Sequence, residues 1–375
     1  MIEPKQFYDL LLKNDVHFFT GVPDSLLKNI CAYITDNTDP ELNIIAANEG
    51  NAIGLASGYH LATGKTPLVY MQNSGLGNAV NPLLSLASPE VYGIPILLLI
   101  GWRGEPGVKD EPQHVKQGEV MLDILDAMQI DYELLPDDMS AARPVIEYLI
   151  QQVQTTKTQK ALIVKKNTFE KYVLETVNTN DYQLSREAAI QAVVNHLDDR
   201  DIIVSTTGKA SRELFEFRAT KNSGHQRDFL TVGSMGHANQ IALGIALKKK
   251  NRKVYCFDGD GAALMHTGGM GIIGNYKASN YRHIIFNNGA HESVGGQPTI
   301  GLKIDLDAIA KGFKYQGVFQ ASSLNEINEL MPRIKVMDGP ILLEIKIASS
   351  SRTDLGRPTI APKENKLDFM RFLED

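Results

Sequence analysis

The chain has 375 residues, of which 43% are hydrophobic and 22% are charged, and this is the composition of an ordinary globular protein. Its net charge of −6 argues against nucleic acid or an anionic membrane surface as the main partner. No apolar run reaches membrane-spanning length and no stretch resembles a signal peptide, so we expect a cytoplasmic protein. Cys31 and Cys256 fall in apolar patterns and are expected to be reduced core thiols.

The first part of the chain alternates between helical and extended patterns. Helices are predicted at 4–14, 26–36, 119–128 and 139–153, with an Ala/Gly-rich helix that ends at 62, and strands at 16–20, 44–46, 68–71, 94–100 and 161–164. A charged loop rich in glycine and proline is expected from 101 to 118. Because the strands are almost continuously apolar, the pattern favours a parallel sheet that is covered on both faces.

The second half of the chain repeats this order after a break. Residues 168–184 are polar and lack a clear period, so they are expected to form a linker. The two halves are similar at an offset of about 186 residues, which places the apolar run 94–100 opposite 280–286. We therefore predict an α/β fold of two related doubly wound domains with parallel sheets, at 1–167 and 185–375, without a third domain between them.

One pair of motifs carries most of the functional information. Gly259-Asp260-Gly261 and Asn287-Asn288 each follow an apolar strand pattern in the second domain. Carboxylate and amide oxygens are ligands that suit Mg²⁺. Gly261 and Ala262 open the next predicted helix, where free backbone N–H groups favour an anion. The two motifs together predict a diphosphate that is held with a divalent cation at the strand ends.

This pair resembles the cofactor motif of the thiamine-diphosphate-dependent 2-oxo-acid decarboxylases, in which Gly-Asp-Gly is followed by Asn-Asn at a similar spacing. The resemblance covers nearly the whole chain and extends to Gly-Val-Pro-Asp-Ser, Gln-His-Val-x-Gln-Gly and Gly-Ser-Met-Gly-His. It implies the thiamine-diphosphate-binding fold. Domain 1–167 would then bind the pyrimidine of the cofactor, and domain 185–375 would bind its diphosphate and Mg²⁺.

The resemblance also implies roles for individual residues. Glu49 would stabilise the protonated aminopyrimidine, although an acid at a helix start is also favoured by the helix dipole alone. The implied metal ligands are Asp260, Asn288 and the backbone oxygen of Ala290, with Asn287 as an alternative. The other implied cofactor contacts are Thr207, Gly208, Gly233, Met235, Gly259, Gly261 and Ala262.

Two further residues are candidates for moving protons. Asp24 in Gly-Val-Pro-Asp-Ser and His114 in Gln-His-Val match family positions and could relay a proton after CO₂ leaves. The plainer alternatives are that Asp24 caps the helix at 26–36 and that His114 is a surface-loop residue. Candidate substrate contacts are Ser25, Arg103, Lys109, His114, His291, Ser293 and Gln297, since cations, hydroxyls and amides suit a doubly charged acid.

The implied reaction is the non-oxidative decarboxylation of a 2-oxo acid that carries a second acidic group. The motifs favour 3-phosphonopyruvate, with phosphonoacetaldehyde as the product in phosphonate biosynthesis, and 3-sulfopyruvate is the alternative substrate. A non-catalytic binding subunit of the same fold is the alternative of another class. Because the family places its active sites between subunits, we expect a homodimer or a larger homo-oligomer.

Overall fold

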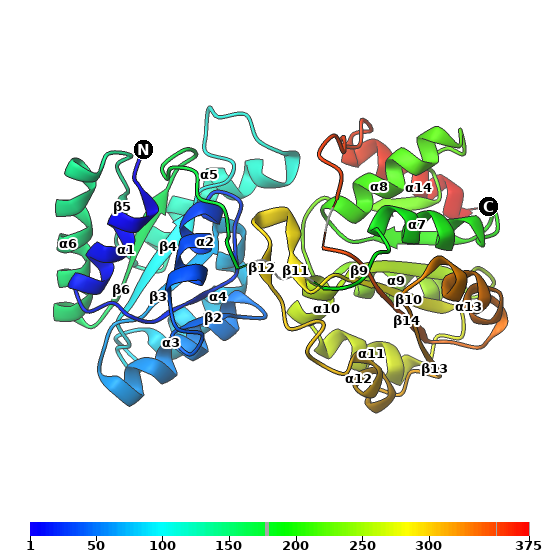
Figure 1. The fold of residues 1–375 in the computed structure, drawn as a ribbon, viewed down its shortest axis with the longest axis horizontal. Helices are drawn as coiled ribbons and strands as arrows, with labels where there is room; N and C mark the ends of the chain where they lie inside the picture. Colours follow the sequence, from blue (N-terminus) through cyan, green and yellow to red (C-terminus); the bar gives the residue numbers. More distant parts are fainter. Residues whose placement is uncertain (177–179, 350, 375) are drawn as a thin grey trace. The chain divides into compact units, whose positions relative to one another are not determined.

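The computed structural model describes residues 1–176, 180–349 and 351–374, so positions 177–179 of the predicted linker lie outside the described residues. The chain divides into two compact units, Met1–Val177 with Ser293–Gln297 and Asn178–Glu292 with Pro298–Asp375. Each unit is built around one six-stranded parallel sheet with helices on both faces (Figure 1). The predicted boundaries at 167 and 185 stay predictions.

The first unit contains the strand order β2-β1-β3-β4-β6-β5. Its strands are β1 (Phe19–Gly21), β2 (Asn43–Ile45), β3 (Leu68–Gln72), β4 (Ile96–Gly101), β5 (Tyr132–Leu134) and β6 (Gln159–Val164). Its helices are α1 (Pro4–Lys13), α2 (Lys28–Asn37), α3 (Glu49–Thr63), α4 (Leu76–Pro82), α5 (Pro112–Ala127) and α6 (Met139–Thr156).

Alternating side chains of β4 show how the first sheet is buried on both faces. Leu97 and Leu99 belong to the core cluster that contains residues of α1, α2 and α6. Leu98 and Ile100 belong to the opposite cluster, with residues of α3 and α5. Successive side chains of a strand point to opposite faces, so a strand that is covered on both sides must be apolar throughout.

The second unit contains the strand order β13-β14-β10-β9-β7-β8. Its strands are β7 (Ile202–Ser205), β8 (Asp228–Leu230), β9 (Val254–Gly259), β10 (Tyr281–Asn287), β13 (Gly317–Ala321) and β14 (Ile341–Lys346), and the short strands β11 (Ala290–His291) and β12 (Gln297–Pro298) follow β10. Its helices are α7 (Arg186–Asn195), α8 (Lys209–Thr220), α9 (Ala238–Lys248), α10 (Asp260–Met265), α11 (Gly268–Tyr276), α12 (Leu306–Gly312), α13 (Leu324–Val336) and α14 (Pro362–Glu374).

The two sheets have the same topology. Read from the β8 edge, the second order is β8-β7-β9-β10-β14-β13, which repeats the first order strand for strand. Leu68 at the start of β3 and Val254 at the start of β9 keep the predicted offset of about 186 residues. The predicted fold class, two related doubly wound domains, is confirmed.

Two local predictions were wrong. The predicted loop 101–118 ends early, because α5 begins at Pro112, whose fixed φ suits the first turn of a helix. The second is the cap of α2: this helix begins at Lys28, after Leu27, and no side chain caps it.

Among the described residues, no helix combines the length and the apolar character that spanning a bilayer requires. Cys31 and Cys256 are free and buried, as predicted.

Candidate functional site

The Gly-Asp-Gly motif lies at the carboxyl end of β9, in the middle of the second sheet. Asp260 is the first residue of α10, and its side chain is only 3% exposed. Its carboxylate accepts a hydrogen bond from the Thr299 hydroxyl. Burial raises the pKa of Asp260 to about 6, against the lowering effect of Thr299 and of backbone N–H groups that include those of Gly261 and Asn288. These named partners are neutral donors, so a cation would complete the charge balance of this carboxylate.

The two asparagines after β10 make different contacts. The Asn287 amide nitrogen donates to Glu344 Oε1 at 2.6 Å and to the Gly301 carbonyl at 2.9 Å. The Asn288 amide nitrogen donates to Glu292 Oε2 at 3.3 Å, and its Oδ1 accepts the N–H of Ala290 at 3.0 Å. Both asparagines are buried, and the choice of metal ligand between them stays a prediction.

The loops after β7 and β8 carry the other predicted cofactor residues of this unit. Gly208 has a φ of 96°, in the left-handed region that favours glycine, and α8 begins at the next residue. The Thr207 hydroxyl donates to the Val232 carbonyl at 2.8 Å, which joins the two loops beside Gly233. The Met235 side chain faces α10, because a carbon added at Gly261 would lie 3.3 Å from its methyl group.

The loop after β10 places one predicted substrate residue beside the Gly-Asp-Gly motif. The His291 ring lies next to Gly261, since a carbon added at Gly261 would be 3.1 Å from it. Burial lowers the pKa of His291 to about 4. Ser293 is exposed and Gln297 is buried, and both belong to the segment that groups with the first unit.

In the first unit, Glu49 is the first residue of α3 and is buried. Asn78 donates a hydrogen bond to Glu49 Oε2 at 2.8 Å. Gly75 leaves the space that the carboxylate occupies, because a carbon added there would overlap the Glu49 side chain. The helix itself is capped by Asn48, so Glu49 is not needed as its cap.

The strand ends of the same unit bring Asp24, Ser25 and Arg103 together. Asp24 is fully buried and accepts hydrogen bonds from Gln72 Nε2 at 2.5 Å and from the backbone N–H of Leu26 at 2.8 Å. Burial raises its pKa, while the hydrogen bonds and the Arg103 charge oppose the rise. Asp24 is therefore buried close to Arg103, and it does not cap α2.

Arg103 links this cluster to the start of α5. Its Nη1 donates to the Ser25 hydroxyl at 2.7 Å, and its Nε donates to Asp110 Oδ2 at 2.8 Å. A second bond, from Nη2 to Asp110 Oδ1, makes the pair bidentate. Lys109 is exposed, and within the described residues no hydrogen bond or ion pair joins it to Asp24, Arg103 or His114.

His114 lies in the first turn of α5 and not in a surface loop. Its side chain is 9% exposed, and among the described residues its Nδ1 has no hydrogen-bond partner. Burial lowers its pKa to about 4, with a further lowering by the nearby Arg103 charge and an opposing effect from Asp110. The imidazole is therefore neutral at physiological pH.

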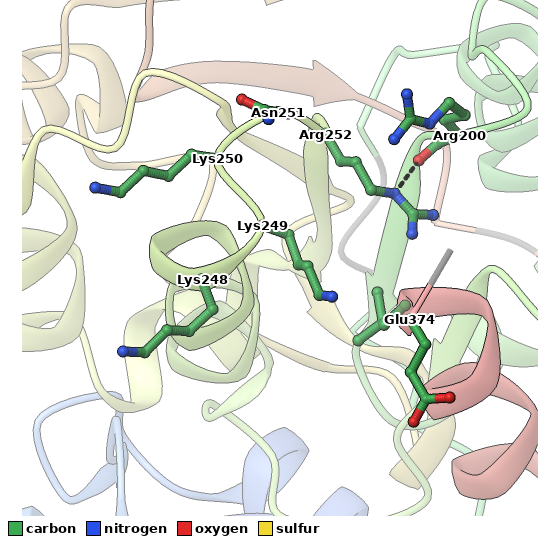
Figure 2. A pocket seen from close by; sticks show the side chains of 8 residues that line it. Arg200, Lys248, Lys249, Lys250, Asn251, Arg252 and Glu374 are labelled. Carbon is green, nitrogen blue, oxygen red and sulfur yellow. Dashed lines mark hydrogen bonds between the residues drawn. The ribbon is translucent and has the colours of Figure 1, made fainter.

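A basic pocket of about 170 Å³ lies elsewhere in the second unit (Figure 2). It is lined by Arg200, Lys248, Lys249, Lys250, Asn251, Arg252, Leu373 and Glu374. The end of α9 and the loop after it, which supply Lys248 to Arg252, precede β9, whereas Asp260 follows β9. The six residues of β9 span about 20 Å, so the pocket is not part of the candidate site.

Five residues that contact the predicted site residues were not themselves predicted from the sequence. Gln72, Asn78, Asp110, Thr299 and Glu344 each hold a predicted residue by a hydrogen bond. Their types are common at strand and helix ends, and their partners are distant in sequence. No local signal therefore distinguishes them, apart from the polar type of Glu344 within an apolar strand.

Comparison with protein families matches both halves of the chain. Residues 4–130 match the family described as thiamine pyrophosphate enzyme, N-terminal TPP binding domain. Residues 206–345 match the family described as thiamine pyrophosphate enzyme, C-terminal TPP binding domain.

Curated relatives align over nearly the full length. A phosphonopyruvate decarboxylase of Streptomyces viridochromogenes is 32% identical over 369 residues, which cover 94% of this chain and 90% of the relative. The phosphonopyruvate decarboxylase of Streptomyces hygroscopicus is 32% identical over 368 residues, covering 94% and 89%. A sulfopyruvate decarboxylase of Methanosarcina acetivorans is 26% identical over 390 residues, covering 98% and 96%.

The lowered pKa of His114 predicts a pH dependence of stability. Between the ordinary value of 6.5 and about 4, the unfolded chain binds a proton at His114 that the folded chain does not. The free energy of unfolding should therefore fall as the pH is lowered through this window, and it should fall less in His114→Gln. Urea unfolding at pH 7 and pH 5 measures the difference, with His60→Gln as a control at a helix end. Equal losses in His114→Gln and the unsubstituted protein would contradict the prediction.

Proposed function

Because the chain belongs to the phosphonopyruvate decarboxylase family of thiamine pyrophosphate enzymes, we propose that it removes CO₂ from 3-phosphonopyruvate and releases phosphonoacetaldehyde. The observation that carries this proposal is the 32% identity over 94% of the chain to the Streptomyces enzymes. The lower identity of 26% to the sulfopyruvate decarboxylase leaves 3-sulfopyruvate as the second candidate substrate. We place the reaction in phosphonate biosynthesis, in the cytoplasm.

The second unit offers a donor set that fits Mg²⁺. Asp260 is buried and its named partners are neutral, which is the situation that a bound cation would relieve. We propose Asp260, Asn288 and the Ala290 carbonyl as its ligands, all of which are oxygen donors. Thr207 and Gly208 stand at the start of α8, where free N–H groups suit the diphosphate. When bound, thiamine diphosphate supplies a nucleophilic carbon and an electron sink for the loss of CO₂.

Glu49 supplies the carboxylate that the pyrimidine ring requires. Asn78 and the space at Gly75 hold the Glu49 side chain in one position within the first unit. Its role is to stabilise the protonated ring through a carboxylate oxygen, which promotes the proton loss that activates the cofactor.

Asp24 and His114 have different roles in the transfer of a proton to the carbon that has lost CO₂. Asp24 holds a proton more readily than an exposed aspartate, because burial raises its pKa. His114 is a neutral imidazole near pH 7, and its Nδ1 is buried without a partner among the described residues. We assign Asp24 as the donor and His114 as the group that orients the reacting carbon or returns the proton.

The Arg103 cluster is the proposed binding site of the phosphonate group. Arg103 and the Ser25 hydroxyl are already in contact, and together they present a cation and a hydroxyl. The bidentate Asp110 orients the guanidinium, so the anion meets a preorganised partner. Lys109, His291, Ser293 and Gln297 stay candidate substrate contacts.

The proposed function is tested by identifying the product. With thiamine diphosphate and Mg²⁺, the protein should convert 3-phosphonopyruvate to phosphonoacetaldehyde and CO₂, and omission of either cofactor should abolish turnover. The same assay with 3-sulfopyruvate, alone and in competition, compares kcat/KM for the two acids. A higher kcat/KM for the sulfonate would favour the second candidate, and no product from either acid would reject the decarboxylase proposal and leave a binding subunit.

The substitution Glu49→Gln tests the contribution of the Glu49 charge to turnover. Glu49→Gln keeps the side-chain length and should preserve folding, but kcat should fall about 100-fold or more because the neutral amide stabilises the protonated ring poorly. Circular dichroism checks the fold, and steady-state kinetics measure kcat. Glu41→Gln, an exposed acid of the same unit, serves as the control. Turnover near that of the unsubstituted protein would remove Glu49 from this role.

We propose a homodimer or larger homo-oligomer whose active sites lie between subunits. This follows from the family to which the chain belongs, whose sites combine a pyrimidine-binding and a diphosphate-binding domain. Analytical ultracentrifugation at assay concentration should give at least twice the monomer mass. A fully active monomer would refute this assembly.

A further inference from the structure

We infer that Glu292 is a positioning residue for the metal side of the site: its carboxylate orients the Asn288 amide so that the amide oxygen faces the cation. The inference rests on the proposed function, in which Asp260, Asn288 and Ala290 hold Mg²⁺. Glu292 is not part of that ligand set, and it lies in the short helical turn after β11.

The strand order places Glu292 close to this ligand set. In the second sheet β9 pairs with β7 on one side and with β10 on the other, and all three strands are parallel. The loops that follow β7 and β10 therefore stand on either side of Asp260, which follows β9. A side chain that connects those two loops crosses the end of β9.

The Glu292 carboxylate makes this connection. Its Oε1 accepts a hydrogen bond from Lys209 Nζ at 2.9 Å, and Lys209 is the first residue of α8 after the β7 loop. Its Oε2 accepts from Arg186 Nη1 at 2.8 Å and from the Asn288 amide nitrogen at 3.3 Å. One carboxylate thus binds two cations and the proposed metal ligand.

Both ends of this arrangement are anchored in buried structure. Arg186 makes a bidentate pair with Glu213 of α8, at 2.8 and 2.9 Å, and Glu213 is 2% exposed. On the other side, the Asn288 carbonyl accepts hydrogen bonds from Asn180 at 3.1 Å and from Ser349 at 2.8 Å. Glu292 is therefore held by Arg186 while the Asn288 backbone is held independently, so the amide between them has little freedom.

The chemistry of the two groups then determines the amide orientation. A carboxylate can only accept hydrogen bonds, so the Asn288 side chain must direct its NH₂ group towards Glu292. The amide oxygen is thereby turned away from Glu292, where it accepts the Ala290 N–H. A cation needs this oxygen, because the NH₂ group cannot act as a ligand. Glu292 thus selects the one orientation of Asn288 that is competent to bind metal.

A neutral amide at position 292 would no longer fix the orientation of the Asn288 amide. In Glu292→Gln, Arg186 and Lys209 compete for one remaining oxygen, and the new NH₂ group is left to face Asn288. Two NH₂ groups repel, so the Asn288 amide turns its oxygen towards position 292 and away from the metal. Loss of an outer partner of this kind typically weakens metal affinity about 10- to 100-fold.

The experiment measures Mn²⁺ binding to the full-length protein by electron paramagnetic resonance of the free ion, with thiamine diphosphate present. Glu292→Gln should raise the Kd for Mn²⁺ about tenfold or more. In the decarboxylation assay, the KM for Mg²⁺ should rise while kcat recovers at saturating Mg²⁺ and the KM for 3-phosphonopyruvate is unchanged.

Glu187→Gln is the matched control. Glu187 lies in the same unit and also binds an arginine, with Arg352 Nε at 3.1 Å, but this pair is partly exposed. Its substitution removes the same charge, and the Kd for Mn²⁺ should stay within about twofold.

Each outcome decides the inference. A Kd for Mn²⁺ in Glu292→Gln within about twofold of the unsubstituted protein would overturn it, as would an equal rise in Glu187→Gln. If Glu292→Gln does not fold, Glu292→Asp keeps the charge beside Arg186 but shortens the reach to Asn288, and it should weaken Mn²⁺ in the same way. The binding measurement needs no substrate, so it separates the two proposals. If the unsubstituted protein binds Mn²⁺ and Glu292→Gln weakens that binding, but the unsubstituted protein does not decarboxylate, the proposed reaction is rejected and the role of Glu292 stands.

Discussion

The burial of the Asp260 carboxylate at the end of β9 is the constraint on which the second unit depends. β9 lies between two parallel neighbours, so its last residues are surrounded by the loops that follow β7 and β10. A carboxylate in that position loses water, and Thr299 and backbone N–H groups replace it only with neutral donors. The loop after β7 is in turn connected to the loop after β8 through Thr207, and the loop after β10 is connected to α8 through Glu292.

The repeated topology gives the same edge of each sheet a different chemistry. In the first unit, Asp24 follows β1, Glu49 follows β2 and Arg103 follows β4, so groups that hold protons and anions gather at the strand ends. In the second unit, the same edge carries oxygen donors of the kind that suit a metal ion, with Asp260 after β9 and Asn288 after β10. One scaffold thus carries two different sets of side chains at its strand ends.

Charged groups near both sets of strand ends are paired in ways that orient them. Arg103 is held by Asp110 and Arg186 by Glu213, each through two hydrogen bonds. A bidentate pair through Nε and Nη2 fixes the plane of the guanidinium, so the Nη1 group points in one direction. In Arg103 that group meets Ser25, and in Arg186 it meets Glu292. Asp110 and Glu213 therefore each orient an arginine, and the arginine in turn contacts Ser25 or Glu292.

The sequence by itself determined the fold class, the internal repeat and the family, because strand periodicity and the spacing of Gly-Asp-Gly to Asn-Asn are local patterns. It also singled out Glu49, Asp24 and Asp260, which lie where chain-local motifs place strand ends. Only the tertiary structure decided that His114 lies in a buried helical turn, that Asp24 is not a helix cap, and that Glu292 connects Lys209 to Asn288. Such contacts join residues far apart in the chain, and hydrogen-bond partners across a sheet edge leave no periodic signal in the sequence.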